Sequence, residues 1–395
     1  MKSICFYFQV HQPFRLRPYK FFDIGNNHYY YDDVQNAWLC RRIADKCYLP
    51  TNELLYNLIK RYPNKIHIAY SITGTAIEQF ERYTPEVMES FKRLIGTGCV
   101  EILGETFHHS LASLKSPNEF KEQVELHSKT IKDIFGVTPR VFRNTELIYS
   151  DEIGRQVKAM GFKGELMEGA KQVLGWRSPN FVYEHKDKNG FRLLMKNFQL
   201  SDDIAFRFSQ QSWSEWPLTA DKFAAWLSSL QNTETVNLFM DYETFGEHQW
   251  KETGIFDFLN ALPEEIFKRN DFKFATPSEV IAEYSPKEPI ECDYPVSWAD
   301  EERDLSAWLG NDLQDDAFNQ LYNMENDVKA TNNPDLLSVW RHLQTSDNLY
   351  YMCTKWFSDG DVHKYFNHYN TPYEAYINFM NILSDLRLTL KSNKS

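Results

Sequence analysis

The stretch ICFYFQV at residues 4–10 decides the fold class of this chain of 395 residues. It is almost wholly apolar, and His11-Gln12-Pro13 follows at once. A strand that is apolar on both faces is typical of a parallel sheet covered by helices. The same pattern recurs in six further runs and in an eighth candidate at 272–275; the six runs are 66–72, 100–103, 140–145, 164–167, 191–196 and 236–240.

Amphipathic segments long enough for helices lie between these runs, for example at 52–61, 86–95 and 119–135. The alternation of strand and helix over the first 285 residues predicts an α/β fold with helical crossovers. Three helix starts carry a hydroxyl cap, a proline and a glutamate three residues after the cap; the caps are Ser116, Thr276 and Thr371.

The composition of the sequence changes at 286–297, where Pro286, Pro289 and Pro295 indicate a linker. Beyond it, apolar residues keep helical spacing in three segments, which predicts a C-terminal helical bundle. We therefore expect two domains, residues 1–285 and residues 286–395.

Composition excludes several classes of protein. The net charge is −12 and no Lys/Arg-rich run occurs, which argues against nucleic acid as a partner. No stretch of about eighteen apolar residues exists, so no membrane span is expected. Six scattered cysteines without a recognisable export signal favour reduced, buried thiols and a cytoplasmic protein. Aromatic residues make up 15% of the chain, which excludes disorder; they either fill the core or line a site where rings stack on a ligand such as a sugar or a base.

Carboxylates recur where the predicted strands end, and Glu146 and Asp241 form the best pair. Each directly follows an apolar strand, the fourth and the seventh. Two carboxyl groups that face each other across a pocket are what glycoside hydrolysis needs. Glu243 shares a face with Asp241 if the backbone stays extended, so it is expected to bind a sugar hydroxyl or to tune the pKa of Asp241; a surface charge is the alternative.

Two other functions remain open on the sequence. His108-His109 and Asp202-Asp203 suggest a metal site, and a metal-dependent carbohydrate deacetylase would need a His/His/Asp cluster. No HxxxH or HExxH spacing is present, however, so no metal and no cofactor is predicted. The other alternative is a catalytically silent glycan-binding protein.

Asp347 lies on the apolar stripe of a predicted helix, four residues after Leu343 and three before Tyr350. Burying a carboxylate is unfavourable unless it has a hydrogen-bond or ion-pair partner, or a functional role. It either bonds a neighbouring helix or reaches into the site at the mouth of the barrel.

Five motifs in this order resemble those of glycoside hydrolase family 57, the second α-amylase family. They are His11-Gln12-Pro13, Gly104-Glu105-Thr106, Thr145-Glu146-Leu147-Ile148-Tyr149, Met240-Asp241-Tyr242-Glu243-Thr244-Phe245-Gly246-Glu247-His248 and Leu343-Gln344-Thr345-Ser346-Asp347.

The resemblance implies an incomplete seven-stranded parallel (β/α) barrel followed by a C-terminal α-helical bundle that completes the site. It implies a retaining double displacement on α-1,4-glucans, with Glu146 as nucleophile, Asp241 as general acid/base and no metal in the chemistry. Hydrolysis and 4-α-glucan transfer both remain open, as does the oligomeric state. The sugar subsite would be lined by His11, Glu105, Glu243, His248 and Asp347.

Several aromatic residues are candidates for the wall of a sugar cleft. Trp298 lies in a Ser-Trp-Ala-Asp segment before the first bundle helix, and Tyr242 follows the acid/base. Trp340 is a third candidate, whereas Trp308 fits an apolar stripe and is expected in the core.

Overall fold

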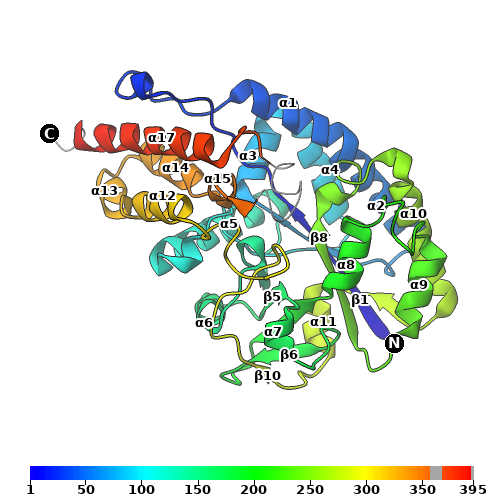
Figure 1. The fold of residues 1–395 in the computed structure, drawn as a ribbon. Helices are drawn as coiled ribbons and strands as arrows, with labels where there is room; N and C mark the ends of the chain where they lie inside the picture. Colours follow the sequence, from blue (N-terminus) through cyan, green and yellow to red (C-terminus); the bar gives the residue numbers. More distant parts are fainter. Residues whose placement is uncertain (356–366, 393–395) are drawn as a thin grey trace.

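The computed structural model describes residues 1–355 and 367–392 (Figure 1). All eight predicted strands are present, although the fourth ends earlier than expected. The strands are β1 (Lys2–Val10), β2 (Ile68–Ile72), β3 (Val100–Ile102), β4 (Val141–Arg143), β5 (Gly164–Glu168), β6 (Val182–His185), β7 (Arg192–Lys196), β8 (Thr235–Asp241), β9 (Phe272–Phe274) and β10 (Pro289–Ile290).

The strands form two five-stranded sheets, ordered β3-β2-β1-β8, with β9 also on β1, and β10-β6-β7-β5-β4. All pairings are parallel except β6 with β7. Sequence reasoning missed β6 and β10 because β6 is a short polar strand of a hairpin and β10 has two residues.

Hydrogen bonds join the two sheets at both seams. Between β3 and β4, Gly104 N donates to Val141 O at 3.0 Å and Arg143 N donates to Gly104 O at 2.8 Å. Between β7 and β8, Asn197 N donates to Asn237 O at 2.8 Å. The seven parallel strands therefore follow one another as β1-β2-β3-β4-β5-β7-β8, and β8 pairs back with β1.

Strand β1 shows why its sequence is apolar throughout. Ile4, Phe6 and Phe8 belong to a core cluster shared with the surrounding helices, while Cys5 and Tyr7 belong to a second cluster with residues of β5, β7 and β8. Both faces of the strand are buried, as expected for a parallel sheet between layers. All six cysteines are buried, and none of them is in a disulfide.

The helices begin largely where the caps predict. Thr276 makes a complete capping box with Glu279, and the hydroxyls of Ser116 and Thr371 accept from the third residue of their helices. The helices are α1 (Asp33–Ile43), α2 (Leu49–Arg61), α3 (Gly74–Tyr83), α4 (Pro85–Ile95), α5 (Pro117–Phe135), α6 (Asp151–Ala159), α7 (Lys171–Leu174), α8 (Phe198–Ala205), α9 (Ala220–Ser229), α10 (Ile255–Arg269), α11 (Pro277–Glu283), α12 (Asp312–Tyr322), α13 (Glu325–Ala330), α14 (Pro334–Leu343), α15 (Ser346–Tyr350) and α17 (Pro372–Ser392).

Helices α12, α13, α14, α15 and α17 gather on the side of the molecule away from the N-terminus (Figure 1). The loop after β1 reaches them, because Gly25 N and His28 Nδ1 both contact the buried Asp385 carboxylate of α17, at 2.7 and 2.8 Å. Within the described ranges, no helix combines the length and apolarity that a membrane span requires.

Candidate active site

The predicted site residues meet where the parallel strands end. His11 follows β1, Glu105 follows β3, Asp241 is the last residue of β8, and Glu146 lies in the 3-10 turn η4 (Thr145–Leu147) after β4. Carboxyl ends of parallel strands lie at one edge of a sheet, which is where α/β enzymes bind their ligands.

Glu146 is held by three hydrogen bonds in an unusual backbone conformation. Its φ is +58°, a left-handed value that is strained for a side chain other than glycine and is typical of functional sites. Its Oε1 lies 3.2 Å from His109 Nε2 and accepts from Ser346 Oγ at 2.9 Å, and its Oε2 accepts from Trp298 Nε1 at 2.8 Å.

Charged neighbours keep Glu146 ionised. Burial alone would raise the pKa of this carboxyl, but the hydrogen bond and charge of His109, the charge of Arg143 and the Trp298 N–H together lower the pKa to about 2. Glu146 is therefore an anion across the neutral range.

The pKa of Asp241 shifts in the opposite direction to that of Glu146. Burial and the negative charge of Glu146 raise its pKa to about 6, against the weaker influence of Arg143, His109 and Lys196. Of two neighbouring carboxyl groups, one is thus anionic and the other retains its proton in mildly acidic solution. That division is what a nucleophile and a general acid require.

His109 is the site residue that sequence reasoning missed, because it was weighed only as a metal ligand beside His108. Its Nδ1 lies 3.4 Å from Glu105 Oε2, and its other ring nitrogen contacts Glu146. Burial would lower its pKa, but these carboxylates raise it to about 9, so the ring is a cation that bridges them. The same bond helps to lower the pKa of Glu105 against its burial.

The helical region contributes Asp347, whose Oδ2 lies 2.9 Å from His11 Nε2. The His11 ring also stacks on His109 with centroids 4.0 Å apart. The prediction of one continuous helix through Asp347 was wrong, since α14 ends at Leu343 and Asp347 is the second residue of the short helix α15. The break turns Ser346 and Asp347 towards the strand ends.

Glu243 is buried two residues after Asp241, and the half-buried His248 donates its backbone N–H to Glu243 O at 2.9 Å. Glu243 Oε1 accepts from the Tyr48 hydroxyl and from Gln12 Nε2, the latter at 3.2 Å. Burial and the charge of Asp241 raise the pKa of Glu243 to about 8, so this carboxyl is largely protonated at neutral pH. Burial lowers the pKa of His248 to about 4, which leaves that ring neutral.

Two aromatic predictions were wrong. Tyr242 is fully buried in the core, and its hydroxyl donates to Asn52 Oδ1 at 2.6 Å, so its ring cannot stack on a sugar. Trp340 is also fully buried and donates to Leu321 O at 2.8 Å. Trp308 lies in the core as predicted.

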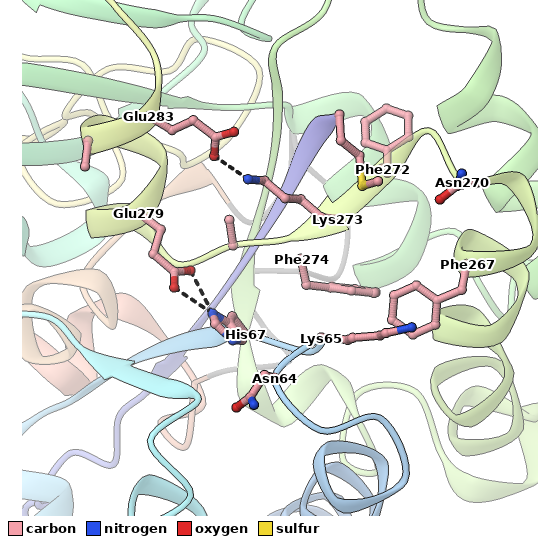
Figure 2. Close-up of a pocket in the computed structure, with 13 residues that line it drawn as sticks. Asn64, Lys65, His67, Phe267, Asn270, Phe272, Lys273, Phe274, Glu279 and Glu283 are labelled. Carbon is pink, nitrogen blue, oxygen red and sulfur yellow. Dashed lines mark hydrogen bonds and ion pairs between the residues drawn. The ribbon is translucent and has the colours of Figure 1, made fainter.

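A cavity of about 610 Å³ lies at the opposite, N-terminal end of the strands (Figure 2). Four of its ionisable side chains form two pairs: His67 Nδ1 lies 2.7 Å from Glu279 Oε1, and Lys273 Nζ lies 2.6 Å from Glu283 Oε2. The Lys65 ammonium lies 5.5 Å from the centroid of the Phe267 ring. Its lining residues include none of the predicted site residues. In the described part of the chain, no three His, Cys, Asp or Glu side chains group so as to hold a metal ion, which a deacetylase site would need.

One ionised carboxylate and one carboxyl group of raised pKa, both at the strand ends of an α/β fold, are typical of enzymes that use two carboxyl groups in different roles. The model of glycosyl hydrolase family 57 matches residues 5–293, and the chain belongs to this family. A candidate α-amylase from Methanocaldococcus jannaschii is 45% identical over 98% of this chain and 85% of its own length. An α-amylase from Pyrococcus horikoshii is 28% identical, over 33% of this chain and 20% of its own length.

Solved structures share the fold at low sequence identity. A 4-α-glucanotransferase from Thermococcus litoralis has a TM-score of 0.67 at 15% identity, with 88% of this chain and 56% of that chain covered. A branching enzyme from Thermococcus kodakaraensis also has a TM-score of 0.67, at 13% identity, with 89% and 86% covered.

Proposed function

We propose that this enzyme cleaves α-1,4-glucans with retention of configuration, through a covalent glycosyl-enzyme. The observation that carries the proposal is the pair formed by an ionised Glu146 after β4 and an Asp241 at the end of β8 whose pKa is raised to about 6. The α-amylase name of the relative that is 45% identical supports the choice of substrate.

In the proposed first step, the Glu146 carboxylate attacks the anomeric carbon while Asp241 donates its proton to the leaving glycosidic oxygen. In the second step, ionised Asp241 takes a proton from water, and the resulting hydroxyl oxygen displaces Glu146 from the anomeric carbon. A sugar hydroxyl in place of water would give 4-α-glucan transfer. Retention requires the two carboxyl groups about 5–5.5 Å apart in the liganded enzyme.

The remaining predicted residues take supporting roles in this proposal. His11, Glu105, Glu243, His248 and Asp347 would surround the sugar, while Trp298 would combine a hydrogen bond to Glu146 with one wall of the subsite. Tyr242 is no longer among them.

The proposal also includes the finer architecture. The two joined sheets support an incomplete seven-stranded barrel over residues 1–285, and the helices after β10 support a bundle over residues 286–395. Ser346 and Asp347 of α15 would then complete the site from the second domain. A cytoplasmic location remains an expectation from the sequence.

Incubation with maltoheptaose, followed by sizing of the products, tests the proposal. Shorter products alone mean hydrolysis, and longer products as well mean transfer. Glu146→Gln and Asp241→Asn should each lower kcat by orders of magnitude while oligosaccharide binding persists. Retained turnover in either variant would refute its assigned role, and binding without turnover by the unaltered protein would support a silent glycan binder. Loss of activity in a chelator, restored by zinc, would favour the deacetylase.

A further inference from the structure

Arg143 is a buried cation without hydrogen-bond acceptors. It ends β4, three residues before Glu146, and its side chain is fully buried. Within the described residues, none of its three guanidinium nitrogens has a hydrogen-bond partner. Burying a guanidinium without hydrogen-bond acceptors destabilises the folded protein, so we expect this side chain to have a functional role as well as a packing role.

The contact that Arg143 does make leads to the nucleophile candidate. Its guanidinium carbon lies 4.8 Å from the centroid of the Trp298 ring, a cation–π distance. Lys196 Nζ lies 5.4 Å from the same centroid. The Trp298 N–H then donates to Glu146 Oε2 at 2.8 Å. Arg143 and Lys196 thus contact the Trp298 ring, and the N–H of that ring binds the Glu146 carboxylate.

We propose that Arg143 is a positioning residue for the reaction, which fixes the Trp298 ring and through it the Glu146 carboxylate. The inference rests on the proposed roles of Glu146 and Asp241. Because guanidinium stays charged at every working pH, this positive charge is constant while its neighbours titrate.

The electrostatics agree with this placement. The charge of Arg143 contributes to lowering the pKa of Glu146 and opposes the rise in the pKa of Asp241. Other ionisable groups also act on this carboxyl pair, so the test must isolate one charge; they are Tyr7 on β1, His109 after β3, Lys196 on β7, Glu243 after β8, and Asp347 and Tyr350 on α15.

The pH profile of kcat/KM on maltoheptaose distinguishes positioning by charge from mere packing. Arg143→Met keeps the unbranched apolar stem of the side chain and removes the charge, whereas Arg143→Lys keeps a charge. We expect Arg143→Met to lower kcat about 100-fold and to move the alkaline limb, set by Asp241, to higher pH by about half a unit or more. Arg143→Lys should leave that limb in place. A limb that stays in place in Arg143→Met, or moves as far in Arg143→Lys, would overturn the inference.

Trp298→Phe keeps a ring over the guanidinium but removes the N–H, and it provides the test if Arg143→Met fails to fold. We expect kcat to fall about tenfold with the alkaline limb unmoved, because one hydrogen bond to an ionised carboxylate is lost and the charge stays. Unchanged kcat would overturn the route through Trp298. Glu146→Gln serves as the separate control: if it retains turnover, the proposed function fails instead.

Discussion

Replacing His109 by glutamine should expose how much the bridge between Glu105 and Glu146 contributes to the reaction. The bridge is a protonated ring, since its pKa is raised to about 9. Lowering the pKa of Glu146 from 4.5 to about 2 corresponds to roughly 3 kcal/mol in favour of the anion, at about 1.4 kcal/mol for each tenfold change. The hydrogen bond and the charge of His109 are the largest of the influences that lower this pKa against burial, ahead of Arg143 and Trp298.

We therefore expect the acid limb of kcat/KM against pH to move up by about two units in His109→Gln, because the nucleophile becomes protonated in mild acid. The assay is maltoheptaose cleavage between about pH 3.5 and 7, with circular dichroism to confirm folding at each pH. His108→Gln is a matched control, because burial lowers the pKa of His108 far enough to leave that ring uncharged. An acid limb that stays where it is in His109→Gln would refute the reasoning.

Three further outcomes are expected. Asp241→Asn should raise Tm by about 2–4 °C at pH 7.5 but not near pH 4, as calorimetry at both pH values can check. The reason is that the folded protein raises the pKa of Asp241 from 3.8 to about 6, so ionisation of Asp241 destabilises the folded state increasingly between these two pH values. Tyr242→Phe should cost about 1–2 kcal/mol of stability in urea unfolding by stranding Asn52, with KM for maltoheptaose unchanged; a raised KM would restore Tyr242 to the sugar cleft. Gly246→Ala should abolish most activity and cost more than about 2 kcal/mol, because φ is +111° and the added Cβ would lie 2.0 Å from a backbone carbonyl of the α1–α2 connection. Gly254→Ala, with a φ of +85° and open space, is its control and should cost only about 1 kcal/mol.

Much of the fold was accessible from local patterns. Runs such as residues 4–10 and 236–240 are apolar on both faces, and each became a buried parallel strand. Caps such as Thr276 located helix starts to within a residue. The hairpin of β6 was missed because a short strand with polar residues carries no such signal.

Side-chain environments were less accessible. The two-residue period of a strand would place Tyr242 on the face opposite Asp241, and its ring does lie in the core cluster; the 3-10 turn after β8 then ends that period, so spacing alone does not place Glu243. The break between α14 and α15 likewise lies in Gln344-Thr345, where helical spacing continues through the sequence although the helix does not.

The sequence by itself determined the strand–helix alternation, the order of the motifs and the presence of two carboxylates after strands, because each depends on residues that are neighbours in the chain. Only the tertiary structure decided which carboxyl group is ionised and which keeps its proton. That difference arises from His109, Arg143 and Trp298, which approach Glu146 from β3, β4 and the segment after β10. A pKa depends on distances between charges and on burial, and neither is encoded in the spacing of residues along the chain.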